Sequence, residues 1–78
     1  MSDFKFEIIR SLGVLSEGTK GWNKEVNLVS WNGHSTKLDI RDWGPGHGKI
    51  GKGITINSEE FAVLKEITNN LQWEKEQR

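Results

Sequence analysis

The chain has 78 residues, of which 33% are apolar, and eleven Lys and Arg balance eleven Asp and Glu, with no cysteine. This length makes one small domain and excludes a multidomain enzyme, and the missing cysteines exclude disulfides, thiolate zinc sites and a cysteine nucleophile. A monomer of this size buries only about 60% of its unfolded surface, so we expect the chain to be stabilised by oligomerisation. We also expect a cytoplasmic protein with no membrane contact, because neither a signal peptide nor an apolar run of ~18 residues is present.

Alternating apolar and polar residues predict the first two strands. The pattern begins at residues 4–8 and continues to Val14, and Gly13 is expected to bend or bulge this strand. Residues 17–21 form a loop by composition. Residues 26–31 then predict the second strand.

Asparagine and glycine mark the next connection. The pair Asn32 and Gly33 predicts a hairpin turn, because a type I′ turn requires positive φ at both central positions. Residues 38–43 form the third predicted strand. The Gly- and Pro-rich residues 44–48 cannot form regular structure, and residues 50–56 resume the alternation as the fourth strand.

A helix is predicted after the fourth strand. Asn57 supplies an acceptor for the first turn, and Glu59 and Glu60 suit the positive end of the helix dipole. An apolar stripe with helical spacing then contains Phe61, Val63, Leu64, Ile67 and Leu71. The predicted fold class is α+β, a four-stranded antiparallel sheet followed by one C-terminal helix, in a domain of residues 1–72 with a charged tail at 73–78.

Two patterns that resemble catalytic motifs lack essential parts. Residues 46–53 nearly match a phosphate-binding loop, but a glycine replaces the hydroxyl residue and a strand follows where a helix is needed. The second pattern is that of a metal nuclease, which needs carboxylates and imidazoles that converge on one point. Alternation instead places Asp39 and Asp42 on opposite faces of their strand. We interpret His34 and His47 as surface residues of glycine-rich turns. We therefore expect no catalysis, no metal and no cofactor.

The tryptophans and the basic residues point to a binding surface. Basic residues are concentrated in residues 20–52, and three of the four tryptophans lie in this segment beside basic or amide residues. Alternation places Arg41 and Trp43 on one strand face, opposite Leu38 and Ile40, which we expect to face the core. An exposed aromatic beside a guanidinium can stack on unpaired bases and follow their phosphates. Alternatively, the tryptophans fill the core or a dimer interface.

Several segments resemble one known family in order and spacing. Residues 37–43, 51–61 and 64–67 are similar to the single-stranded-DNA-binding domain of the transcriptional coactivator positive cofactor four, which shows a D-I-R-aromatic strand, a basic glycine strand and a helix start. Residues 20–25 and 29–32 add a similarity to its bacterial YdbC-type branch. The resemblance implies a homodimer that packs through the helix and holds single strands on two curved sheets. The Ser-rich and Lys-rich regulatory arm of the eukaryotic coactivators has no match here, so we expect strand binding rather than regulation.

The resemblance also assigns roles to particular residues. It implies that Lys24 and Arg41 contact phosphates and that Lys52 lies in the basic strand. It also implies that Phe61 occupies the family's aromatic position at the helix start and that Trp31 lies near a second family aromatic position. The complete expected nucleic-acid-binding set is Lys20, Trp22, Lys24, Asn27, Trp31, Lys37, Arg41, Trp43, Lys49, Lys52 and Phe61.

The expected function is non-catalytic binding of single-stranded DNA with little sequence preference, in replication, recombination, repair or transcription. The expected location is the cytoplasm, at the nucleoid if the source is bacterial. The alternatives are a protein-interaction module and a binder of single-stranded RNA with the same fold.

Overall fold

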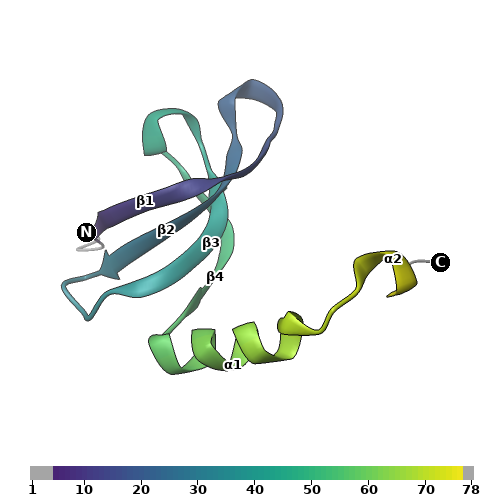
Figure 1. The fold of residues 1–78 in the computed structure, drawn as a ribbon. Coiled ribbons are helices and arrows are strands. Elements are labelled where there is room, and N and C mark those ends of the chain that lie inside the picture. The colour runs from purple at the N-terminus through teal and green to yellow at the C-terminus, as the bar shows by residue number, and fades with distance from the viewer. Residues whose placement is uncertain (1–4, 77–78) are drawn as a thin grey trace.

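The computed structural model describes residues 5–76 as one curved sheet with a helix attached to its last strand (Figure 1). The strands are β1 (Phe6–Glu17), β2 (Asn23–Trp31), β3 (Lys37–Trp43) and β4 (Ile50–Ile56). They pair antiparallel in chain order. Helix α1 (Ser58–Asn69) follows β4, and a short helix α2 (Trp73–Glu76) begins the segment that was predicted as a charged tail. The predicted fold class is confirmed.

Strand β1 differs most from its prediction. The predicted start at Phe4 lies outside the described residues, and the strand continues to Glu17, which was expected to begin a loop. Its register to β2 shifts between Ile8 and Arg10, between Ser11 and Gly13, and between Val14 and Ser16. The second shift confirms the irregularity expected at Gly13. Such shifts increase the local twist of a strand, which suits the curl of this sheet.

The predicted turn and helix start are confirmed. Asn32 and Gly33 both have positive φ, at 52° and 78°. At the start of α1, Asn57 Oδ1 accepts a hydrogen bond from the Glu60 backbone N–H at 2.7 Å, and Glu60 Oε1 accepts one from the Asn57 N–H at 2.9 Å. This reciprocal capping box satisfies two backbone donors and sets the point where the helix begins.

The buried core is small and lies on one face of the sheet. Val29 and Trp43 are 0% and 1% exposed, and Asn27 and Asp39 are buried with them. Alternation places these residues on one face, because Asn27 is paired with Asp39 across β2 and β3. Leu38, like its neighbour Ile40, was expected in the core but lies on the opposite face and is only half-buried.

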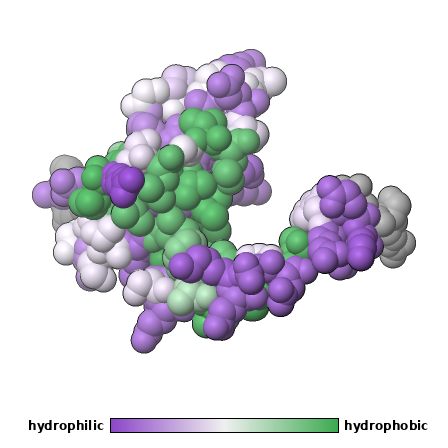
Figure 2. All heavy atoms as spheres, in the orientation of Figure 1, coloured by the Kyte–Doolittle hydropathy of each residue, from purple (hydrophilic) through white to green (hydrophobic). Residues whose placement is uncertain are grey.

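That opposite face carries an uncovered apolar surface. Every residue of α1 is exposed, so the helix does not cover the sheet. Figure 2 shows apolar side chains gathered over the strands on the side from which α1 extends. The large exposed apolar residues of the strands and α1 are Ile9, Leu12, Val14, Leu15, Ile50, Ile54, Phe61, Val63, Leu64 and Ile67. We call this set, without Ile50 and Val14, the apolar face; Val14 is paired with Glu25 and therefore lies on the core face. A monomer rarely leaves such an apolar surface in water.

Candidate nucleic-acid interface

Four ring side chains form a cluster on the core face of the sheet. Trp31 and Trp43 stack in parallel with centroids 6.3 Å apart. Phe6, at the start of β1, lies 5.8 Å from Trp31 and 5.1 Å from Trp43. His47, in the loop between β3 and β4, meets Trp43 edge-on at 4.9 Å. Because Asn23 rather than Trp31 is the cross-strand partner of Trp43, the sheet must curl for the two indoles to meet.

This cluster buries Trp43. Its side chain is 1% exposed, and within residues 5–76 its Nε1 has no hydrogen-bond partner. The prediction that Trp43 lies on an exposed sheet face is wrong, because the curl brings Phe6 and His47 against it. Trp31 is only half-buried, so it is the indole of the cluster that this face presents to solvent.

Arg41 lies beside Trp31 and is held by a dense set of hydrogen bonds. Its Nε and Nη2 donate to the two carboxylate oxygens of Asp39 at 2.7 and 2.9 Å. Its Nη1 donates to the Gly51 carbonyl at 3.1 Å, and Nη2 also donates to Thr55 Oγ1 at 3.3 Å. The Asp39 side chain is 0% exposed and that of Arg41 is 14% exposed, so this ion pair is almost removed from water. A buried carboxylate requires such a partner.

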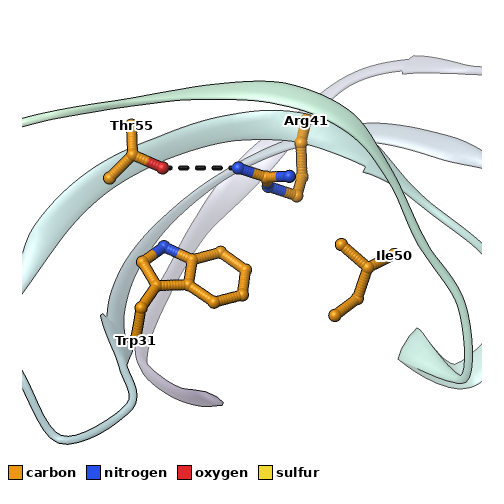
Figure 3. Close-up of a pocket in the computed structure, with 4 residues that line it drawn as sticks. All are labelled: Trp31, Arg41, Ile50 and Thr55. Carbon is orange, nitrogen blue, oxygen red and sulfur yellow. Dashed lines mark hydrogen bonds between the residues drawn. The ribbon is translucent and has the colours of Figure 1, made fainter. Parts of the chain in front are cut away.

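An open pocket lies between Arg41 and Trp31. The guanidinium carbon sits 4.9 Å from the centroid of the Trp31 ring. Ile50 and Thr55 complete a hollow of about 210 Å³ (Figure 3). Figure 3 shows the four side chains coming from facing strands and directed toward the same space. We call this the Trp31 pocket; it offers an aromatic surface and a cation within the same small volume.

Gly53 permits the Arg41 side chain to lie flat against β4. It is the cross-strand partner of Arg41, and a Cβ at this position would overlap Arg41 Cβ and lie 2.5 Å from the Ile40 carbonyl oxygen. From sequence, Gly53 was a mismatch to the phosphate-binding loop and part of the basic glycine strand of the family resemblance. Its structural role is to give room to the strand that carries the guanidinium.

Glu25 and His47 form a second polar link behind the cluster. His47 Nε2 and Glu25 Oε1 are 2.8 Å apart, and Asn27 Nδ2 donates to the same Glu25 oxygen at 3.2 Å. Burial alone would raise the pKa of Glu25, but the hydrogen bonds from His47 and Asn27 and the nearby His47 charge together lower it. His47 lies in the glycine-rich turn and is partly exposed, as interpreted, but its ring also joins Glu25 to Trp43.

Asn27 does not present its amide to a ligand at the surface. It is 1% exposed, and within residues 5–76 its Oδ1 has no hydrogen-bond partner. The structure therefore places this expected binding residue in the core of the isolated chain.

The expected lysines divide into two groups. Lys20 and Lys49 line a second hollow, of about 410 Å³, together with Trp22. Lys24 lies 3.6 Å from Asp42 in an exposed ion pair, and Lys52 is exposed on β4. The structure thus brings Lys20, Trp22 and Lys49 together at the loops, apart from the Trp31 pocket.

Phe61 and Lys37 line a third hollow, on the other face. Together with Leu28 and Leu38 they surround about 210 Å³ at the start of α1. Since Leu38 lies on the face opposite Asp39, the structure does not bring Phe61 to the Trp31 pocket. Phe61 instead contacts Lys65, whose Nζ lies 5.1 Å from the ring centroid.

This chain matches the sequence model of one protein family. The model of the family described as Transcriptional Coactivator p15 (PC4) matches residues 19–67, from the first loop to the last turn of α1. The chain belongs to the PC4 family. The matched range contains Trp31, Arg41 and Gly53, and so includes most of the site described above. The predicted resemblance to this single-stranded-DNA-binding family is confirmed.

The chain is also similar to a protein of a spirochaete. An uncharacterized protein of Treponema pallidum (strain Nichols) is 41% identical over 69 residues, which cover 88% of this chain and 81% of the relative. PC4 is a non-catalytic DNA-binding family, and membership suggests single-stranded DNA binding or transcription-cofactor activity.

Within residues 5–76 no cluster of three or more His, Asp or Glu side chains is arranged to hold a metal ion. None of the helices in that part of the chain is long and apolar enough to cross a membrane. Neither finding adds a further site to the ones described above.

Proposed function

We propose that this PC4-family protein is a non-catalytic, largely sequence-independent binder of single-stranded DNA that acts as a homodimer. The observation that carries the proposal is the Trp31 pocket, where a half-buried indole and a guanidinium 4.9 Å away line one open hollow. An unpaired base has a free face for stacking, whereas a base inside a duplex does not. The site therefore suits a single strand.

Arg41 is suited to position a strand rather than to act as a free charge. It has five N–H donors. Within residues 5–76 it makes four hydrogen bonds, one of them from Nη1. The remaining Nη1 proton is available to a phosphate or a base oxygen. Because Asp39 neutralises most of its charge, the salt-dependent part of binding falls mainly on the lysines.

The exposed lysines supply the electrostatic contribution. In the described part of the chain, Lys20, Lys49 and Lys52 form no ion pair, and the contact of Lys24 with Asp42 is long and exposed. Phosphate contacts of this kind depend on charge and not on base identity, so they give affinity without sequence preference.

The apolar face supports the homodimer. Its residues come from both the sheet and α1, and their exposure in the single chain is typical of a surface that associates. A second copy presents the same surface, so helix-to-helix packing about a two-fold axis covers both. We include Phe61 in this interface rather than in the DNA site, because it lines the hollow between α1 and the sheet.

The cellular setting is part of the proposal. We place the protein in the bacterial YdbC-type branch, in the cytoplasm at the nucleoid; the 41% identity to a Treponema pallidum protein supports only the bacterial part of this placement. Replication, recombination, repair and transcription all expose single strands, and the residues of the site favour none of them.

Titration with oligo-dT, oligo-rU and a matched duplex at low and high salt tests the proposal, with intrinsic Trp fluorescence as the readout. We expect oligo-dT to quench the fluorescence in a salt-sensitive manner and the duplex to bind much more weakly. Stronger binding of oligo-rU would identify the protein as an RNA binder, and no binding of either strand would overturn the proposal.

A pair of tryptophan variants locates the site. Trp31→Leu should weaken oligo-dT binding about 5- to 100-fold, as expected for loss of one stacked base. The matched control is Trp73→Leu, because Trp73 is 63% exposed on α2, away from the pocket (Figure 1), and its loss should leave affinity unchanged. Circular dichroism checks that Trp31→Leu remains folded. Equal affinities of the two variants would remove Trp31 from the site.

A further inference from the structure

The two loops that carry Lys20 and Lys49 lie at the same end of the sheet. One, between β1 and β2, contains the short 3₁₀ turn Thr19–Gly21; the other, residues 44–49 between β3 and β4, contains the 3₁₀ turn Pro45–His47 and ends at Lys49. Figure 1 shows both loops projecting together from the end of the sheet that is distant from α1. Between them lies the hollow of about 410 Å³, which we call the loop cleft.

The loop cleft is closely packed where the two loops meet. A Cβ at Gly21 would lie 2.9 Å from Pro45 Cγ, so the proline ring rests directly on the glycine of the other loop. A Cβ at Gly51 would lie 2.9 Å from Trp22 Cζ3, and one at Gly44 would lie 3.3 Å from Trp22 Cζ2. Three glycines thus let Trp22 and Pro45 form the walls, and these contacts hold the Trp22 ring in place.

The lining of the loop cleft has an aromatic wall and positive charge. Its residues are Lys20, Trp22, Pro45, Gly48 and Lys49, with no acidic side chain among them. Trp22 is half-buried, so part of its indole is accessible to solvent. Within residues 5–76 neither Lys20 nor Lys49 forms an ion pair, which leaves both ammonium groups available to an anion.

The loop cleft lies beside the Trp31 pocket. Lys49 lines the cleft and the next residue, Ile50, lines the pocket. Consecutive Cα atoms are about 3.8 Å apart, but neighbouring side chains of a strand point to opposite faces, so the two hollows lie on either side of the start of β4. A strand with one base in the pocket reaches the loop cleft by passing around this end of the sheet.

We propose that the loop cleft binds one further unpaired nucleotide of the same strand, with its base against Trp22 and its phosphate between Lys20 and Lys49. This inference rests on the proposed single-strand function and adds a second base site at the end of the sheet. An aromatic wall and two cations match a base and a phosphate, and the hollow is within the size range of small-ligand sites. An acidic peptide would use the lysines but not the indole.

Two variants and a crosslink test the loop cleft. An oligo-dT in which thymine is replaced by 5-bromouracil should, on irradiation, form adducts on the peptide that contains Trp22 as well as on the one that contains Trp31. Trp22→Leu should weaken oligo-dT binding about 5- to 100-fold. The double variant Lys20→Gln, Lys49→Gln should reduce the slope of log K against log salt by about 0.7, the value for one phosphate contact on a single strand.

The double lysine variant keeps the test valid if Trp22→Leu does not fold, since both lysine side chains project from exposed residues. Lys75→Gln, on α2, is the matched control and should leave the salt slope unchanged.

If wild-type protein binds oligo-dT but the loop-cleft variants bind as tightly and with the same slope, the loop-cleft inference is overturned and the proposed function stands. If wild-type protein binds no single strand, the proposed function fails first. Competition with oligoglutamate tests the acidic-peptide alternative. The loop-cleft inference would also be overturned if oligoglutamate displaced oligo-dT from Lys20 and Lys49 and left the fluorescence of Trp22 unchanged.

Discussion

Arg41 and Asp39 lie side by side on β3 and are joined by two hydrogen bonds, Nε to Oδ1 at 2.7 Å and Nη2 to Oδ2 at 2.9 Å. Thr55 Oγ1 also donates to Asp39 Oδ2 at 2.7 Å, which satisfies the carboxylate further. The residue that best matches the family's phosphate-contact position is therefore also a structural partner of a buried charge. Its substitution affects stability and binding together.

Arg41→Ala should destabilise the protein by about 3–5 kcal/mol, because it leaves the carboxylate of Asp39 buried without its partner. The measurement is chemical unfolding at fixed protein concentration. Lys24→Ala is the matched control, since the ion pair of Lys24 with Asp42 is exposed and should contribute no more than about 1 kcal/mol. Similar unfolding midpoints for the two variants would show that the Asp39 charge does not depend on Arg41.

Gly53→Ala should also destabilise the sheet, by at least about 1–3 kcal/mol, because the added methyl group overlaps Arg41 Cβ and approaches the Ile40 carbonyl oxygen. Gly13→Ala provides the control, because no atom lies within 4 Å of a Cβ at that position. Thermal unfolding of both variants gives the comparison. A Gly53→Ala protein as stable as Gly13→Ala would contradict the close packing of β3 on β4.

The link between Glu25 and His47 predicts a pH dependence. Against the effect of burial, the hydrogen bonds from His47 and Asn27 hold the pKa of Glu25 in the folded protein below the ordinary value for a glutamate, so its stabilising contribution is present above the ordinary pKa and is lost as the pH falls through the folded pKa. Glu25→Gln should therefore lose less stability than wild type between neutral and strongly acidic pH. Unfolding curves measured at several pH values between about 6 and 3 test this.

The control for the pH experiment is Glu7→Gln, an exposed carboxylate on β1 that has no ion pair within residues 5–76. It should follow the wild-type pH profile. Parallel profiles for wild type and Glu25→Gln would show that the contact with His47 does not stabilise the folded state.

Ile67→Glu tests the proposed dimer. Ile67 is 70% exposed on α1, so in a monomer the change should alter stability by no more than about 0.5 kcal/mol. In a dimer that buries the apolar face, the carboxylate would lose water without a partner and the subunits should separate. Analytical ultracentrifugation gives the mass, with Glu66→Gln on the same helix as the control. A wild-type mass equal to that of the single chain would remove the dimer from the proposal.

The fold could be predicted because its signals are local. Alternation within each strand, the Asn32–Gly33 turn and the Asn57 cap each depend on a few neighbouring residues, and all three were confirmed. Strand ends were less predictable, since β1 extends to Glu17 by pairing with β2, which begins at Asn23. Pairing across strands extends a strand beyond its own pattern.

The candidate site was only partly predictable. The spacing of Asp39 and Arg41 places both on one strand face, so their contact could be inferred from alternation. The burial of Trp43 depends on the curl of the sheet and on Phe6, which is distant in sequence. No pattern signalled the Glu25 and His47 contact either, because a loop position rather than a strand register brings the imidazole to the carboxylate.

The irregular edges of the sheet determine how copies of this chain can assemble. β1 and β4 are the edge strands; β1 has three register shifts along its length, and the pairing of β4 to β3 has one. Bulges and charged residues at an edge hinder strand-to-strand joining between molecules. With its edges irregular and its apolar face open, the homodimer proposed above would form face to face rather than edge to edge, and so would close instead of growing into a filament.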